Sequence, residues 1–331
     1  MKFDAVYYEP AIFDYPLGRQ LREEYGDLPW IPIESHNSIR EMQEKPNDQF
    51  GHMQRNLIAG IRKTHKYVEN NQVSAYLVHY TSSGCTAMCL YCYLVCNYNK
   101  CAYLRLFVNR EQMLDRIIKK GKNSGTPLTF EIGSNSDLVL ENTMTGNLLY
   151  TIPRFAEEGE GKLTFPTKFH MVEPLLDLDH RGKVIFRMSV NPQPIIQKIE
   201  LGTSGLRQRI EAVNQMCEAG YPCGLLIAPV ILVEGWKEMY TGLLEELRDG
   251  LSDKMKIQMV LEIILMTYTD GHRAINSEAF PNAPDLYDRE QMTGRGRGRY
   301  CYRAESREES QLYLRQEIGR VLGNVPILYI S

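Results

Sequence analysis

Strand-like and helix-like segments alternate along most of this chain, and this alternation limits the possible fold more than any other sequence feature. The strand candidates are short apolar or alternating stretches at 74–80, 128–132, 163–167, 184–190, 225–233 and 257–265. Apolar residues at helical spacing lie between them, at 110–120, 148–155, 206–217 and 239–247. About six such units predict a parallel sheet covered by helices.

A parallel sheet of this kind curls into a full or partial barrel, with its active site at the C-terminal ends of the strands. The chain has 331 residues, of which 43% are apolar, so it can bury a large core. We therefore expect an α/β fold of the full or partial TIM-barrel type in a single domain. Its parts would be an N-terminal extension over 1–70, the barrel over 71–270 and a C-terminal region over 271–331.

Three cysteines, Cys85, Cys89 and Cys92, follow the first strand candidate at the spacing Cys-x3-Cys-x2-Cys. This spacing supplies three thiolates to a four-iron, four-sulfur (4Fe-4S) cluster and leaves one iron without a protein ligand. Zinc is the alternative, because Cys96 and Cys101 lie nearby and four sulfurs suit a tetrahedral ion. Structural zinc sites usually come as two close cysteine pairs, however, which this segment lacks.

No segment of the sequence has the features of a signal peptide or of a membrane span, so we expect a cytoplasmic protein. In a reducing compartment Cys217 and Cys223 are read as core thiols. The formal charge of −3 excludes a globally basic protein, and contact with nucleic acid would need a local patch.

Such a patch exists near the C-terminus, where arginines alternate with glycines before two tyrosines. The DNA-contact candidates are Arg295, Arg297, Arg299 and Tyr300. Arginine pairs with phosphates, and tyrosine can stack on bases. We expect a tight hairpin around 292–303. The alternative is a solvated, charged loop.

Polar residues follow several strand candidates at the edge where an active site is expected. They are Ser134, Asn135 and Ser136 after the second strand, Lys168 after the third, and Ser189 and Asn191 at the C-terminal end of the fourth. Polar side chains placed repeatedly at this edge can line one pocket. The alternative for serine and asparagine is that they cap the following helices, which does not apply to lysine.

Taken together, these motifs make the chain resemble the spore photoproduct lyase family of the radical S-adenosylmethionine superfamily. The resemblance covers the chain from about Ser35 to its end. It rests on the cysteine motif with Tyr91 and Tyr93, on Glu131 to Asp137, on Thr167-Lys168-Phe169-His170, on Phe186-Arg187-x-Ser189-x-Asn191, and on Gly202-Thr203-Ser204.

The resemblance implies a partial (β/α)6 barrel that binds the 4Fe-4S cluster and S-adenosylmethionine (AdoMet). It implies a 5′-deoxyadenosyl radical that takes a hydrogen from 5-thyminyl-5,6-dihydrothymine in ultraviolet-damaged DNA and so restores two thymines. By this resemblance Ser136, Lys168, Ser189 and Asn191 bind the cofactor. The partners would be damaged DNA, entered by the C-terminal hairpin, and an electron donor such as flavodoxin or ferredoxin.

The chain departs from the family at Ser134, where the Bacillus-type enzymes have a cysteine that returns the hydrogen atom. An alcohol O–H bond is too strong to donate hydrogen to an allylic radical, so Ser134 does not replace that thiol. Three explanations stay open. Tyr91 and Tyr93, or one of the thiols Cys96, Cys101 and Cys301, can supply the hydrogen; the chain can be a paralogue with another lesion or substrate; or the serine can be an engineered change.

Two other functions remain as alternatives. One is radical modification of another nucleic acid or of a peptide. The other is a lesion-binding protein that has lost catalysis, which the missing thiol would suit.

Overall fold

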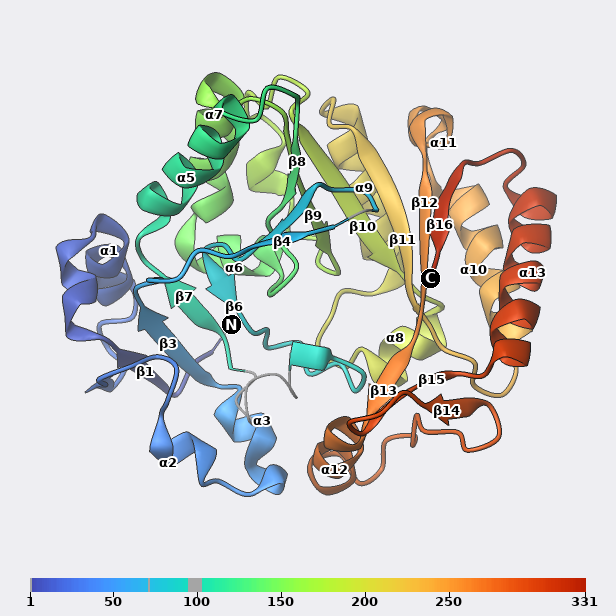
Figure 1. Ribbon diagram of the computed structural model, residues 1–331, viewed down its shortest axis with the longest axis horizontal. Helices are drawn as coiled ribbons and strands as arrows, with labels where there is room; N and C mark the ends of the chain where they lie inside the picture. The colour runs from blue at the N-terminus through green and yellow to red at the C-terminus, as the bar shows by residue number, and fades with distance from the viewer. Residues whose placement is uncertain (1, 71, 95–102) are drawn as a thin grey trace. The chain divides into compact units, whose positions relative to one another are not determined.

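The computed structural model describes residues 2–70, 72–94 and 103–331 (Figure 1). The chain divides into two compact units. The first comprises Met1–Thr86, Leu94–Thr167 and Glu173–Ile185, and the second comprises Ala87–Tyr93, Lys168–Val172 and Phe186–Ser331. Within the described ranges, no helix has both the length and the apolar character that crossing a membrane requires.

The first unit contains a five-stranded sheet that the sequence pattern did not predict, with strand order β2-β1-β3-β7-β6. Its strands are β1 (Ala5–Tyr8), β2 (Trp30–Pro32), β3 (Asn56–Gly60), β6 (Ser82–Ser83) and β7 (Arg105–Phe107), and only β6 pairs antiparallel. Val6 and Leu57 pack in one apolar cluster, and Tyr7 and Ile58 pack in another. Because successive residues of a strand point to opposite faces, this sheet is buried on both sides, as parallel sheets usually are.

Short helical elements surround this sheet. They are η1 (Pro10–Asp14), α1 (Pro16–Glu24), α2 (Arg40–Gln43), η2 (Asn47–Gln49) and α3 (Phe50–Met53). Pro16 is the first residue of α1, a position where proline loses no helical hydrogen bond. The N-terminal 70 residues therefore form a layered α/β structure.

The first unit also holds strands in the order β9-β8-β5-β4. They are β4 (Tyr67–Glu69), β5 (Tyr76–Val78), β8 (Thr129–Glu131) and β9 (Lys162–Thr167), parallel except for β4. The helices are α5 (Arg110–Lys122), α6 (Leu138–Thr145) and α7 (Asn147–Glu158), with the short η3 (Glu173–Leu175). The predicted helix over 148–155 is confirmed as α7. Helix α6 was not predicted; it ends at Gly146, whose φ of 61° suits glycine at a helix end.

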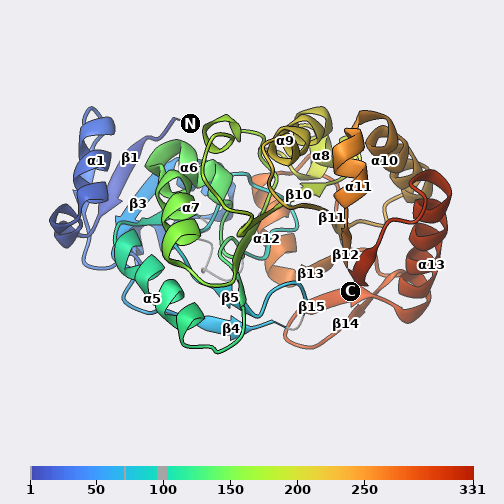
Figure 2. The same cartoon turned by 90° about the horizontal axis from the view of Figure 1, so that it is seen from above.

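Four parallel strands in the order β10-β11-β12-β16 form the sheet of the second unit; the first two residues of β10 belong to the first unit. They are β10 (Val184–Val190), β11 (Cys223–Val230), β12 (Leu261–Leu265) and β16 (Ile327–Ile330). The helices are α8 (Gln193–Ile199), α9 (Leu206–Glu218), α10 (Trp236–Gly250), α11 (Asp253–Gln258) and α13 (Ala304–Val321). Figure 2 shows α9, α10 and α11 along one face of these strands.

The predicted strand over 257–265 is wrong in its first part. Residues 253–258 form helix α11, which Ser252 caps by accepting a hydrogen bond from the Met255 amide at 3.2 Å. Ile257 is 87% exposed on this helix, so its apolar side chain does not mark a buried strand. Strand β12 begins only at Leu261.

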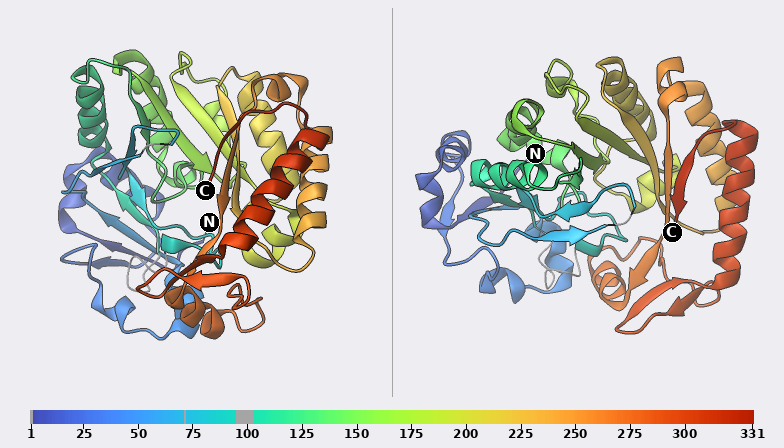
Figure 3. Two further views of the ribbon diagram at one scale, coloured as in Figure 1. Left: turned by 45° about the vertical axis from the view of Figure 1, so that its right-hand side comes forward. Right: turned by 45° about the horizontal axis from the view of Figure 1, so that its top comes forward.

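A three-stranded antiparallel sheet, β13-β15-β14, follows β12 in the second unit, beside helix α12 (Asp270–Ala279) (Figure 3). Its strands are β13 (Thr267–Thr269), β14 (Met292–Gly294) and β15 (Arg299–Tyr302). The expected hairpin around 292–303 is therefore confirmed as the β14–β15 pair.

Candidate active site

The loop that carries the three motif cysteines is called the cysteine loop here, and its residues Ala87–Tyr93 belong to the second unit. Hydrogen bonds to the main chain of this part hold it in place. The Leu90 amide donates to the Ile199 carbonyl at 3.0 Å, and the Gly202 amide donates to the Ala87 carbonyl at 2.8 Å. A Cβ atom at position 202 would lie 2.8 Å from that same carbonyl oxygen, which explains the glycine. The Asn276 side chain also donates to the Leu90 carbonyl, at 2.7 Å.

The three motif cysteines fall in both units, with Cys85 in the first and Cys89 and Cys92 in the second. Cys89 is buried, whereas Cys85 and Cys92 are partly exposed, and none of the described cysteines forms a disulfide. Among the described residues no group of three or more histidine, cysteine or acidic side chains is gathered around one metal ion. Cys96 and Cys101 lie outside the described residues. The cluster role of the motif stays a prediction.

The polar loop after β8 lies against the start of the cysteine loop. The Gly84 amide donates to the Asn135 carbonyl at 2.9 Å, within the first unit. The hydroxyl of Ser136 and the amide nitrogen of Asn135 are buried and have no hydrogen-bond partner among the described residues. Buried polar atoms normally have partners, so this loop fits a polar ligand such as AdoMet.

Capping does not explain these residues, because Asp137 is the N-cap of α6. Its carboxylate accepts hydrogen bonds from the Val139 and Leu140 amides at 3.1 and 3.2 Å. It also accepts from the Thr167 hydroxyl at 2.8 Å, which ties the end of β9 to the start of α6. Ser134 lies three residues before this N-cap, so the alternative that Ser134 caps the helix is wrong.

Lys168 lies in a polar cluster of the second unit. Its ammonium group donates to the Ser189 hydroxyl and to the Ala228 carbonyl, both at 2.6 Å, and to Glu200 Oε1 at 3.0 Å. The Lys168 side chain is 19% exposed, whereas Glu200 is fully buried. Two predicted cofactor residues, Lys168 and Ser189, are thus in direct contact.

Glu200 is the residue that the sequence reasoning missed, and it is the center of this cluster. Its Oε2 atom accepts from the fully buried Arg209 at 2.6 Å. Its Oε1 atom accepts from the Asn191 amide at 2.9 Å, besides Lys168, and from the Tyr91 hydroxyl. Burial alone would raise the pKa of Glu200, but Lys168 and Arg209 hold it far below its ordinary value, so this carboxylate is ionised.

Tyr91 is a hydrogen-bond donor to a carboxylate in this cluster. Burial and the charge of Glu200 raise the pKa of the Tyr91 phenol well above its ordinary value, so it keeps its proton. Tyr93, the second predicted tyrosine, is 50% exposed. The two tyrosines therefore differ in environment although they are only two positions apart.

Asn191 is fully buried and its amide contacts protein groups on both sides. It donates to Glu200 and accepts a hydrogen bond from the Tyr240 hydroxyl at 3.2 Å. The N-cap of α8 is Pro192, so the capping alternative is wrong for Asn191 as well. Its predicted contact with the cofactor stays a prediction.

The tip of the β14–β15 hairpin consists of three consecutive residues with positive φ: Gly296 at 80°, Arg297 at 53° and Gly298 at 65°. Arg295, Arg297 and Arg299 are all exposed. The Asp270 amide donates to the Gly298 carbonyl at 3.0 Å, which fixes the tip to the start of α12. The segment is therefore a hydrogen-bonded hairpin with solvent-exposed arginines, and its contact with DNA stays a prediction.

Tyr300 packs within the second unit. Its ring lies edge-on to Tyr287 with centroids 4.7 Å apart. Asp270 raises the pKa of the Tyr300 phenol above its ordinary value. Base stacking by Tyr300 stays a prediction, and the exposed arginines are the more accessible part of the hairpin.

A family model described as "Spore photoproduct lyase" matches residues 1–331. The chain belongs to the spore photoproduct lyase family. It is 33% identical to the spore photoproduct lyase of Bacillus subtilis (strain 168), over 98% of this chain and 97% of that protein. It is 30% identical to the enzyme of Geobacillus sp. (strain Y412MC61), over 98% of both chains.

The chain is also similar to a solved structure of a spore photoproduct lyase mutant with bound AdoMet and dinucleoside spore photoproduct. The TM-score is 0.91 and the identity 28%, over 99% of both chains. This similarity confirms the predicted fold class, an α/β fold of the partial TIM-barrel type.

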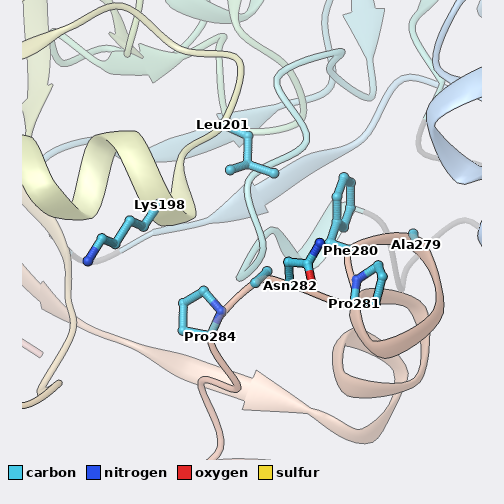
Figure 4. Close-up of a pocket in the computed structure, with 8 residues that line it drawn as sticks. Lys198, Leu201, Ala279, Phe280, Pro281, Asn282 and Pro284 are labelled. Atoms are coloured by element: carbon cyan, nitrogen blue, oxygen red, sulfur yellow. The ribbon is translucent and has the colours of Figure 1, made fainter.

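One surface pocket lies elsewhere in the second unit. Figure 4 shows it between the C-terminal end of α8 and the segment after α12. Its volume is about 690 Å³. Its lining includes Lys198, Leu201 and Phe280. None of the predicted site residues lines it.

Proposed function

We propose that this chain is a radical AdoMet enzyme that cleaves the spore photoproduct, 5-thyminyl-5,6-dihydrothymine, back to two thymines in ultraviolet-damaged DNA. The observation that carries the proposal is the family match along all 331 residues. It is supported by the bound dinucleoside photoproduct in the similar solved structure. We further propose that a flavodoxin or a ferredoxin supplies the electron.

In this proposal Cys85, Cys89 and Cys92 would hold a 4Fe-4S cluster that acts together with bound AdoMet. When bound, these two groups supply the radical that takes a hydrogen atom from the lesion. The donor set fits such a ligand, because Glu200 is already paired with Arg209 and the ammonium of Lys168 suits the carboxylate of AdoMet.

The chain's own side chains have three proposed tasks. Lys168, Ser189 and Ser136 bind the polar atoms of AdoMet, because an ammonium and two hydroxyls match a carboxylate and a ribose. Tyr91 and Tyr93 provide phenolic hydrogens close to the cluster loop. The hairpin arginines bind phosphates next to the lesion, which must be extruded from the duplex to be reached.

One assay tests the function. The chain is reconstituted with iron and sulfide without oxygen, reduced with dithionite, and given AdoMet and the dinucleotide photoproduct. Restored thymine is the expected result. Formation of 5′-deoxyadenosine without thymine would identify a relative with another substrate. This outcome is worth testing because Ser134 stands where the Bacillus-type enzymes have the hydrogen-donor cysteine. Absence of both products with an intact cluster would overturn the proposal and leave a lesion-binding protein.

A further inference from the structure

We infer that Glu200 is a positioning residue that couples AdoMet binding at Lys168 to the strength of the hydrogen bond that the Tyr91 hydroxyl donates to Glu200. The inference rests on the proposed function and deepens it. All the groups involved belong to the second unit. The observation behind it is that a single oxygen atom, Glu200 Oε1, accepts hydrogen bonds from both Lys168 and Tyr91.

The contacts of Lys168 show which one a ligand would replace. An ammonium group has three N–H donors, and here Ser189, Ala228 and Glu200 accept from them. A carboxylate ligand must therefore replace or share one of these acceptors. The contact with Glu200 is the longest, 3.0 Å against 2.6 Å for each of the other two. Lys168 can thus turn from Glu200 to the ligand while Ser189 and Ala228 keep it in place.

The charges of the cluster balance only when a carboxylate ligand is bound. Glu200 carries one negative charge, and Lys168 and Arg209 carry one positive charge each, so the three together have a net charge of +1. The carboxylate of AdoMet brings the missing negative charge. Lys168 then pairs with the ligand, and Glu200 keeps Arg209 at 2.6 Å. No buried charge is left without a counter-ion, which would be strongly destabilising.

The same exchange acts on Tyr91. When Lys168 leaves Oε1, that oxygen accepts from fewer donors and its charge is less neutralised, so its hydrogen bond from Tyr91 becomes stronger. Binding of AdoMet thereby fixes the Tyr91 hydroxyl in one orientation. By reciprocity, the hydrogen bond from Tyr91 weakens the hold of Glu200 on Lys168 and favours AdoMet binding.

The test uses Glu200→Asp, which keeps the charge that Arg209 needs but withdraws the carboxylate by one methylene. The matched control is Glu262→Asp. Glu262 is also buried, and it accepts from Arg187 at 2.9 Å and from the Tyr329 hydroxyl at 2.7 Å. AdoMet binding to the cluster-loaded, unreduced protein is measured by equilibrium dialysis, and repair of the dinucleotide photoproduct by product analysis.

We expect Glu200→Asp to bind AdoMet about five-fold more tightly, because Lys168 no longer has to leave a hydrogen-bonded partner. We expect its repair rate to fall about ten-fold, because Tyr91 has lost its acceptor. A folding defect alone would lower both the AdoMet affinity and the repair rate. The control Glu262→Asp should not raise one of these two quantities while it lowers the other. AdoMet binding and repair that fall together, or that match the control, would overturn the inference.

A second variant keeps the test valid if Glu200→Asp does not fold. In Tyr91→Phe, Glu200 Oε1 holds Lys168 more firmly, so AdoMet should bind about three-fold more weakly. Unchanged or tighter binding there contradicts the coupling. A wild-type chain that binds AdoMet without repairing the photoproduct disproves the proposed substrate, and the shifts in AdoMet affinity then still decide this inference. A wild-type chain that does not bind AdoMet overturns it.

Discussion

Ser134 is the residue at which this chain lacks the hydrogen-donor thiol for the last step of the proposed reaction. The thymine radical left after the lesion is cleaved needs a hydrogen atom, and a serine hydroxyl does not release one. Tyr91, with its hydroxyl donated to Glu200, and the half-exposed Tyr93 are the described phenols nearest in sequence to the cluster motif. Quenching is therefore expected to be slow compared with an enzyme that has a thiol at this position.

Replacing Ser134 by cysteine should accelerate repair, because a thiol S–H bond is weak enough to donate to an allylic radical. We expect at least a roughly ten-fold faster repair, equivalent to a barrier about 1.4 kcal/mol lower. The measurement is thymine formed per minute from the dinucleotide photoproduct. Ser134→Ala is the control and should repair at the wild-type rate. A slower Ser134→Cys variant would show that the position does not face the substrate radical.

At this scale the sequence predicted Lys168 and Ser189 but not their partner Glu200. Lys168 follows a strand candidate, where a lysine has no local structural use, so it stood out. Glu200 directly follows Lys198 and Ile199 at the end of the short helix α8, and this sequence pattern is the same as that of an exposed helix end. Only the folded chain shows that its carboxylate is fully buried between residues distant in sequence.

At the scale of elements, a buried carboxylate joins the end of β1 to the ends of its neighbours. Glu9 accepts from the His36 ring at 2.8 Å, from the His36 amide at 3.0 Å and from the Ile61 amide at 2.9 Å. Burial alone would raise the pKa of Glu9, but these hydrogen bonds lower it to about 2 from the ordinary 4.5. Its stabilising effect is therefore full above pH 4.5 and is lost as the pH falls towards 2.

Glu9→Gln should accordingly destabilise the chain at pH 7 by up to about 3 kcal/mol. The difference from wild type should shrink as the pH falls from 4.5 towards 2, because protonation removes the same charge from the wild type. Urea unfolding at several pH values measures this. Glu69→Gln, at an exposed position in β4, is the control and should show no such trend. Parallel curves for Glu9→Gln and wild type over the whole range would contradict the prediction.

The β14–β15 hairpin is the element expected to contact the DNA backbone. Replacing Arg295, Arg297 and Arg299 by glutamine should weaken binding to duplex DNA. The slope of log affinity against log salt should decrease by up to about 3, roughly 0.9 per lost phosphate contact. Repair of the dinucleotide photoproduct should be unchanged, since that substrate offers no flanking phosphates.

Arg315 and Arg320 of α13 provide the matched control for the hairpin arginines. Their replacement by glutamine removes positive charge without changing the hairpin, so the salt slope should stay close to that of wild type. Equal slopes for the hairpin variant and for wild type would mean that the hairpin makes no phosphate contact.

The elements that the sequence predicted are those with enough length to show a period. Residues 184–190 were predicted as a strand and form β10, and the helix over 110–120 is α5. Strands β2, β6 and β7 have only two or three residues each, too few to show alternation, so the sheet of the first unit was missed. Residues 257–260 were misassigned because apolar side chains alone do not separate a short helix from a strand.

On the scale of the whole molecule, five of the eight cysteines should divide into two groups by function. Cys217 and Cys223 are buried core thiols, as predicted, whereas the motif cysteines are the proposed cluster ligands. Alanine at Cys85, Cys89 or Cys92 should reduce the iron content of the reconstituted chain to a small fraction. Alanine at Cys217 or Cys223 should leave it unchanged. Iron retained in any of the first three variants, or lost in either of the other two, would contradict this division.

The main-chain contacts of the cysteine loop have a consequence for the order of assembly. The hydrogen bonds from Leu90 to Ile199, from Gly202 to Ala87 and from Asn276 to Leu90 involve only protein groups. In zinc fingers, by contrast, the free energy of metal binding is the free energy of folding. Because none of these hydrogen bonds uses a metal ligand, we expect this part of the loop to form without iron, and a chain stripped of iron should remain folded and accept a new cluster.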